Sequence, residues 1–256
     1  VNIIIPPISL RGTMITIRKF RNKLFTIDNL IQNGCLTRQL SDFLSFCIQG
    51  RLNLVISGGT GSGKTTLLNV LSRFIPAQER LITIEDAAEL QLHRENLGIL
   101  ESRQPNYEGK GEITIRQLLR NALRMRPDRI IIGEIRGDET FDMLQSMNTG
   151  HSGSMTTVHA NTPRDALRRI ETLSLMVAEN LALSAIRAQI ASAIQLVVQI
   201  QRMPDGQRRI TQVSEISGTE GIEISMQDLF VFDRHQLKTT GIVPRFSDLL
   251  ATRGIE

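Results

Sequence analysis

The feature that most constrains this chain is an eight-residue stretch, residues 58–65, that reads Gly-Gly-Thr-Gly-Ser-Gly-Lys-Thr. An apolar, β-branched run precedes it at residues 52–57, and a run with helical spacing follows at residues 64–74. A strand that passes through a glycine-rich turn into a helix points successive backbone N–H groups into the turn, beside the positive end of the helix. The pattern GxxxxGK[ST] in this setting predicts a phosphate-binding loop.

The side chains that close this loop supply chemistry that the backbone cannot. We expect Lys64 to neutralise the β- and γ-phosphates of a bound nucleotide and the Thr65 hydroxyl to ligate magnesium, so ATP and Mg²⁺ are the predicted ligands. A glycine-rich turn that matches by chance is the alternative, and the correctly placed strand and helix argue against it. The residues predicted to hold the nucleotide are Gly58, Gly59, Thr60, Gly61, Ser62, Gly63, Lys64, Thr65 and Thr66.

Two more apolar, strand-like runs end in an acid: residues 81–84 precede Glu85, and residues 129–133 precede Glu134. Parallel strands deliver their carboxyl ends to the edge of the sheet where ligands bind, so both acids are expected beside the phosphate loop. One can hold magnesium through water while the other accepts a proton from the attacking water. We predict that Glu85 is the base and that Glu134 organises magnesium and water, although the two roles can be exchanged. The alternative is that each acid only caps its strand.

One histidine is expected at the same edge of the sheet. His159 ends the next strand-like run, residues 154–159, and from that position it is predicted to sense the γ-phosphate. A single histidine is more often structural than functional, so a structural role for His159 stays the alternative.

The order of strand-like and helical runs predicts the fold class. Between residues 52 and 159 the two kinds alternate, which is typical of a mostly parallel α/β sheet covered on both faces. Short alternating runs at residues 195–235 predict a small antiparallel meander packed beside that core. We expect residues 1–30 to be the remnant of an N-terminal α/β domain with its linker, and residues 31–256 to form the main domain.

Composition narrows the possible partners. The net charge of +4 comes from dispersed Lys and Arg, and the chain has one Tyr and no Trp, so no direct contact with nucleic acid is predicted. The apolar runs are too short to span a bilayer, and any membrane contact is expected to be peripheral. Cys35 and Cys47 form no CxxC pair and are expected to be reduced core thiols of a cytosolic protein.

Four sequence boxes, in order, resemble the type II/type IV secretion ATPase superfamily. They are the phosphate loop, the acidic box Ile84-Glu85-Asp86 with Glu89, the Walker B variant at residues 130–136, and the histidine box at residues 150–161. The resemblance implies a RecA-like core, ATPase activity and a homo-hexamer. It also implies a cytoplasmic location, peripheral at the inner membrane, where ATP-driven domain movement would act on a platform protein to assemble a pilus or secretion machine.

Within the superfamily, residues 108–112, residues 157–166 and residues 225–232 look most like the Tad (tight adherence, Flp pilus assembly) ATPases. A conjugation or type IV secretion ATPase that supports DNA or protein export is the alternative. A third possibility is a scaffold that binds nucleotide and turns over poorly.

The resemblance also implies that arginines close over the γ-phosphate in the assembled protein. Arg18 and Arg21 are the predicted catalytic arginines, because the superfamily carries basic residues at that junction. Arg116, Arg120 and Arg124 share one helical face and are candidates for an interface, with a solvated basic stripe as the alternative.

Overall fold

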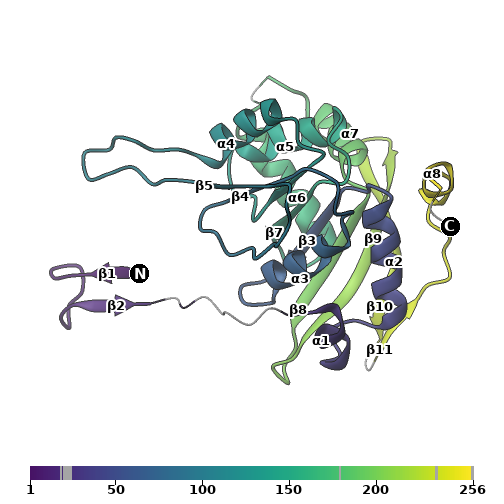
Figure 1. Cartoon of the computed structure of the whole chain (residues 1–256), viewed down its shortest axis with the longest axis horizontal. Helices are drawn as coiled ribbons and strands as arrows, with labels where there is room; N and C mark the ends of the chain where they lie inside the picture. Colours follow the sequence, from purple (N-terminus) through teal and green to yellow (C-terminus); the bar gives the residue numbers. More distant parts are fainter. Residues whose placement is uncertain (18, 20–24, 179, 234–235, 255–256) are drawn as a thin grey trace.

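The computed structural model describes residues 1–17, 19, 25–178, 180–233 and 236–254, and within them one nine-stranded sheet forms the centre (Figure 1). The strand order is β11-β10-β9-β8-β3-β7-β6-β4-β5. The strands are β3 (Leu54–Gly58), β4 (Leu81–Glu85), β5 (Leu97–Glu101), β6 (Arg129–Ile132), β7 (Met155–His159), β8 (Leu196–Arg202), β9 (Arg208–Glu220), β10 (Glu223–Asp233) and β11 (Gln236–Thr239).

The direction of pairing changes at β8. Strands β8, β3, β7, β6, β4 and β5 pair in parallel, and β9, β10 and β11 follow β8 in antiparallel order. The predicted fold class is thus confirmed: a mostly parallel α/β sheet with antiparallel strands near the C-terminus. We expected the antiparallel strands to pack beside the core, but they do not. They extend its sheet, because Leu196 pairs with Leu54 on one edge of β8 and with Glu215 on the other.

Helices cover both faces of the sheet. Because side chains alternate along a strand, Leu54 and Ile56 of β3 join one buried apolar cluster while Val55 joins the other. The first cluster includes α2 (Arg38–Gln49) and α3 (Lys64–Leu71), and the second includes α4, α5, α6 and α7. The remaining bounds are α1 (Ile27–Gln32), η1 (Ser72–Phe74), α4 (Ile115–Ala122), η2 (Leu123–Met125), α5 (Glu139–Asn148), α6 (Pro163–Leu175), α7 (Leu183–Ala193) and α8 (Ser247–Thr252).

Local sequence signals explain where these helices begin. The Thr114 hydroxyl accepts a hydrogen bond from the backbone of Gln117, whose side chain in turn accepts from the Thr114 N–H, which is a complete capping box. The Thr162 hydroxyl caps α6 by accepting the backbone N–H of Asp165, and Pro163 occupies the first turn, where no N–H is needed. These caps satisfy backbone donors that the helices leave unpaired.

A buried ion pair joins the starts of the strands on the side away from their carboxyl ends. Arg129 is fully buried, and its guanidinium donates to both carboxylate oxygens of Glu79 at 2.5 and 3.0 Å and to the carbonyl of Ile48 at 2.5 Å. The backbone of Gly153 passes so close that a Cβ there would lie 2.5 Å from Arg129 Nη1. This charged pair is therefore enclosed by backbone from α2 and from the segment before β7.

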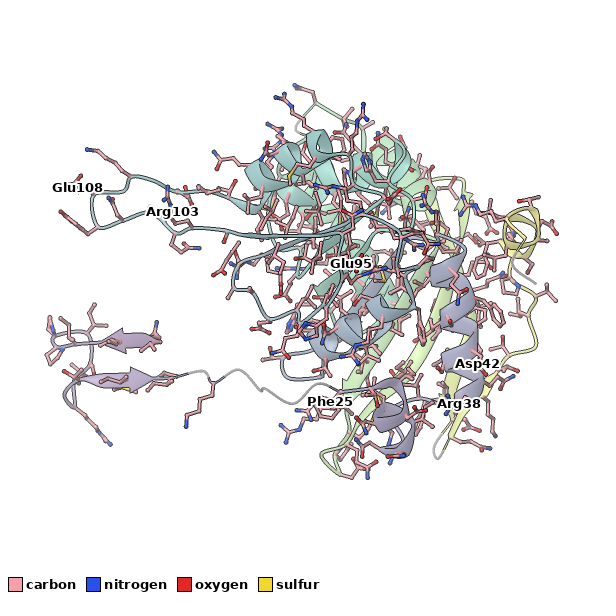
Figure 2. All side chains as sticks on the ribbon, viewed as in Figure 1. Phe25, Arg38, Asp42, Glu95, Arg103 and Glu108 are labelled. Carbon is pink, nitrogen blue, oxygen red and sulfur yellow. The ribbon has the colours of Figure 1, made fainter. Side chains whose placement is uncertain are left out.

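Two segments extend away from this body. The strands β1 (Asn2–Ile4) and β2 (Met14–Thr16) form a separate antiparallel pair with exposed side chains. The segment between β5 and α4 projects from the sheet as a narrow arm that carries Arg103 and Glu108 (Figure 2). Helix α1, which spans the predicted boundary at residue 30, packs on the main body through Leu30, and the division into domains stays a prediction.

Candidate active site

The glycine loop between β3 and α3 has the backbone that its sequence requires. Gly61 and Gly63 have φ values of 68° and 100°, in the left-handed region that favours glycine. Glycine is required at position 58 for a different reason. A Cβ there would lie 2.4 Å from the carbonyl oxygen of Ile200 and 2.5 Å from Ser62 Oγ. The loop therefore turns tightly against β8 and leads into the N-terminus of α3.

The Lys64 ammonium lies at the rim of this loop. It donates to the carbonyl oxygens of Gly58 and Gly59 at 3.1 and 3.2 Å, and its Nζ is 3.6 Å from Glu134 Oε1. The side chain is 10% exposed, so little solvent screens its charge. A cation and a carboxylate thus face each other at the mouth of the loop.

Hydrogen bonds between three strand ends fix the backbone on both sides of Glu134. The N–H of Gly133 donates to the carbonyl of Ile84, and the hydroxyl of Thr157 donates to the carbonyl of Gly133 at 2.8 Å. The N–H of Ile135 donates to the carbonyl of Thr157 at 3.0 Å. These bonds hold the half-buried Glu134 against the cavity that the glycine loop opens into.

Glu85 reaches the same edge as Glu134 but faces another way. Its carboxylate is buried and accepts hydrogen bonds from the backbone N–H groups of Glu89 and Leu90, each at 3.1 Å. Burial raises the pKa of Glu85 to about 7, the two backbone hydrogen bonds oppose this, and the charges of Glu89 and Glu101 add to it. Gly133 packs against it, since a Cβ there would lie 2.9 Å from Glu85 Cγ.

The acid that lines the cavity beside Glu134 is Glu89, while Glu85 is absent from the lining residues. The segment that carries Glu89 is held from two sides: Glu85 accepts its backbone N–H groups, and Asn69 of α3 accepts the N–H of Gln91 at 3.0 Å. Asp86 adds a contact on the outer side, where it pairs with Arg136. The acidic box is therefore anchored to α3 and to the loop after β6.

The cavity has a volume of about 1200 Å³ and gathers most of the predicted site. His159 is exposed within it, and its strand register places it directly beside Gly58. The loop residues that line the cavity are Thr60, Gly61, Ser62, Gly63, Lys64, Thr65 and Thr66. Glycine backbone, Lys64 and the Thr65 hydroxyl are the groups that hold a nucleotide triphosphate and its magnesium, so the residues present fit MgATP.

Among the described residues, the predicted interface arginines Arg116 and Arg120 do not line the cavity. Arg18 and Arg21 fall outside the described residues. Arg116 pairs with Asp138 and Asp142 of the α5 region, and Arg120 pairs with Asp142, so both arginines bind this chain's own acids rather than pointing freely from the surface.

Among the cavity residues that sequence reasoning missed is Arg208. Its Nε donates to the carbonyl of Gly61 at 3.0 Å, and its Cδ packs against Gly63. The far wall of the cavity, which includes Leu30 and Cys35, was missed as well. The turn signal of Pro204, Asp205 and Gly206 predicts a hairpin here, but no motif indicates that the hairpin reaches the loop.

A glycine loop between β3 and α3, with acids on the neighbouring strand ends of a mostly parallel sheet, defines the class of P-loop nucleotide-binding proteins. Residues 3–227 match the family described as Type II/IV secretion system protein. The chain belongs to this family.

Individual relatives agree with that family. A Mycobacterium tuberculosis protein named for conjugal transfer is 38% identical over 218 residues, which are 85% of this chain and 61% of that protein. The type IV secretion system protein PtlH of Bordetella pertussis is 35% identical over 247 residues, which are 87% of this chain and 72% of that protein. The chain thus spans about three fifths of the length of the mycobacterial relative.

A solved structure has the same fold. The VirB11 ATPase from the Brucella suis type IV secretion system, in complex with sulphate, superposes with a TM-score of 0.62 at 31% identity, covering 77% of this chain and 60% of that one. These relatives support a secretion ATPase in general and do not single out the Tad type. Among the described helices, none has the length and apolar character to cross a membrane.

Proposed function

We propose that this chain hydrolyses MgATP to power a secretion or pilus-assembly machine. The observation that carries the proposal is the pairing of Lys64 with Glu134 at the mouth of the glycine loop, 3.6 Å apart, with Glu89 and His159 lining the same cavity. Phosphate binding needs the cation and the loop, and hydrolysis needs carboxylates that act on water. The VirB11 ATPase structure is a complex with sulphate, so a relative takes up a tetrahedral anion.

In this proposal Thr65 ligates magnesium directly and Glu134 holds it through water, as the sequence predicts. The metal would neutralise charge on the β- and γ-phosphates and orient them. Lys64 would share that task, and its proximity to Glu134 places both side chains at the same end of the cavity. His159, next to Gly58 in the strand register, is proposed to contact the γ-phosphate.

For one role, that of the proton acceptor, the geometry favours a different residue from the one predicted from the sequence. Glu85 was predicted as the base, yet its carboxylate is occupied by the backbone N–H groups of Glu89 and Leu90. We therefore propose that Glu89, which lines the cavity, acts on the attacking water and that Glu85 positions it. Glu85→Gln keeps an acceptor oxygen for the backbone and should retain much of the turnover, whereas Glu89→Gln should bind ATP and hydrolyse it at least a hundredfold more slowly.

The central experiment measures MgATP binding and phosphate release together. Lys64→Ala should abolish MgATP binding, and Glu134→Gln should keep binding while turnover falls. Wild-type affinity in the Lys64→Ala protein would contradict the assignment of the loop. If Glu89→Gln turned over normally while Glu85→Gln did not, the original prediction of Glu85 as base would hold instead.

The proposed partners are further copies of this chain, in a homo-hexamer, and a platform protein at the cytoplasmic face of the inner membrane. Arg18 and Arg21 stay the predicted arginines that close over the γ-phosphate. Light scattering with MgATP, with MgADP and without nucleotide tests the assembly, and turnover per chain should rise with protein concentration if neighbouring copies complete the site. A rate per chain that is constant with concentration would contradict the hexamer.

Two machines remain as specific proposals. Residues 108–112 favour a Tad-type pilus, and the names of the relatives favour a conjugation or type IV secretion channel. The machine can be tested by replacing Lys64 with Ala in the native gene and then measuring surface pili and plasmid transfer. Loss of pili with normal transfer supports the Tad proposal, and the reverse result supports the conjugation proposal.

A further inference from the structure

We propose that Arg208 is a nucleotide-positioning residue that holds the crown of the glycine loop and presents its guanidinium to the ribose and α-phosphate. The inference rests on the proposed binding of MgATP and deepens it, because it assigns the nucleoside side of the cavity.

The contacts of Arg208 place it on the loop itself. Its Nε donates to the carbonyl of Gly61 at 3.0 Å, and a Cβ at Gly63 would lie 3.0 Å from its Cδ. The side chain therefore crosses the loop between two of its glycines. Arg208 also lines the cavity, and within the described residues its two Nη groups have no protein partner. The fork of a guanidinium leaves those groups able to bind an anion while Nε stays on the loop.

The position along the nucleotide is inferred from the groups that share the cavity with Arg208. Lys64 and Glu134 line it where the terminal phosphates are proposed to bind. The same cavity is lined by the buried apolar groups of Leu30 and Cys35, with Gln32 and Asn33 as polar neighbours. An apolar wall with a few polar groups suits a purine base. Because Arg208 contacts the loop at Gly61 and lines this cavity, we infer that its guanidinium meets the ribose and α-phosphate, which connect the base to the terminal phosphates.

Two further observations tie Arg208 to that wall. The N–H of Ile210, two residues along β9, donates to the carbonyl of Cys35 at 2.8 Å, so the β8–β9 hairpin and the segment after α1 form one continuous surface. Figure 1 shows the turn between β8 and β9 beside α1. Burial raises the pKa of the Cys35 thiol to about 11, and the Ile210 backbone hydrogen bond and the charge of Arg208 act against that rise.

The neighbouring arginine provides a matched control. Arg209 has the same charge one residue along the chain, but its guanidinium pairs with Asp205 at 3.2 Å and Gln207 at 2.8 Å and lies 5.5 Å from the ring centroid of Phe232. Arg209 does not line the cavity. If the hairpin were only a solvated basic surface, alanine substitution of either arginine should affect nucleotide binding equally. The proposal expects an effect from Arg208 alone.

The experiment is calorimetric titration of Arg208→Ala, Arg208→Lys, Arg209→Ala and wild-type protein with MgADP and with magnesium pyrophosphate. Pyrophosphate occupies the loop but has no ribose or base. Arg208→Ala should weaken MgADP binding ten- to a hundredfold, as expected for lost charge-assisted hydrogen bonds, and change pyrophosphate binding less than threefold. Arg208→Lys should recover part of the loss, and Arg209→Ala should change either ligand less than threefold. Thermal unfolding confirms that each variant is folded.

Three results would overturn the proposal. A loss of MgADP affinity below tenfold in Arg208→Ala would show that the guanidinium does not contact the nucleotide. An equal loss for pyrophosphate would show that Arg208 only shapes the loop. An equal loss of MgADP affinity in Arg209→Ala would show that the effect depends only on the positive charge of the hairpin. If the proposed binding of MgATP were itself wrong, the result would be different: wild-type protein would bind neither MgADP nor MgATP.

Discussion

The raised pKa of Glu85 leads to a prediction for stability. Burial of this residue sets both the sign and the size of the change in the free energy of unfolding with pH. The carboxyl group is 4% exposed, and its pKa is raised from 4.5 to about 7 in the folded chain. A raised pKa means that the folded state holds the proton more tightly than the unfolded state does. The associated stability is fully present below pH 4.5 and is lost as pH rises through about 7. Glu85→Gln replaces the carboxyl with a neutral group of similar shape and should remove this dependence.

The magnitude follows from the two pKa values. A shift from 4.5 to about 7 corresponds to about 3 kcal/mol at 1.36 kcal/mol for each pH unit. The free energy of unfolding of wild-type protein minus that of Glu85→Gln should therefore fall by about 3 kcal/mol between pH 4.5 and pH 8. For a chain of this length the difference in Tm should change by roughly 6–12 °C.

The assay is thermal or urea unfolding of both proteins across that range of pH. Glu112→Gln is the matched control, because Glu112 is exposed on the projecting arm, and its difference from wild type should stay constant. A wild-type minus Glu85→Gln difference that varied by less than 1 kcal/mol would refute the reasoning from burial. A difference that rose with pH would mean that the folded state stabilises the ionised carboxylate.

Two other substitutions test the buried ion pair between Glu79 and Arg129 and the packing of the glycine loop. Glu79→Gln should lower the free energy of unfolding by about 3 kcal/mol, because it leaves the fully buried Arg129 guanidinium without its counter-charge, and urea unfolding at pH 7 measures it. Gly58→Ala should weaken MgATP binding and destabilise the fold by roughly 1–3 kcal/mol, because its Cβ would lie 2.4 Å from the Ile200 carbonyl. Gly59→Ala, with no protein atom within 4 Å of its Cβ, should leave the free energy of unfolding unchanged. Equal destabilisation of the two alanine variants in urea unfolding would contradict the packing argument.

The parts that sequence predicted well are those that short-range physics decides. The glycine loop is contiguous, so its strand, its turn and its helix could be placed from residues 52–74 alone. The parallel order of the central strands follows from the alternation of strand-like and helical runs, because each crossover returns the chain to the same edge. Glu134 and His159 reach the cavity for that reason, as the ends of β6 and β7.

The parts that sequence did not predict depend on contacts between distant segments. Nothing local indicates that β8 pairs with β3, about 140 residues away, and without that pairing the β8–β9 hairpin has no reason to lie over the loop. Arg208 and Arg209 are therefore alike in sequence. The structure separates them because side chains alternate along β9, so one arginine reaches Gly61 and the other turns to Asp205.

Glu85 and Glu89 show the same limit within a single motif. The sequence groups both acids in one acidic box, but it does not say which carboxylate faces the cavity once the strand has ended. Gly133 lacks a side chain, so Glu85 fits beneath the loop and binds the backbone of Glu89. The site thus has an inner acid, Glu85, that holds backbone and an outer acid, Glu89, that lines the cavity and is the proposed proton acceptor. Both substitutions can slow turnover, but only loss of the inner acid should also remove the dependence of stability on pH, and that difference separates positioning from catalysis.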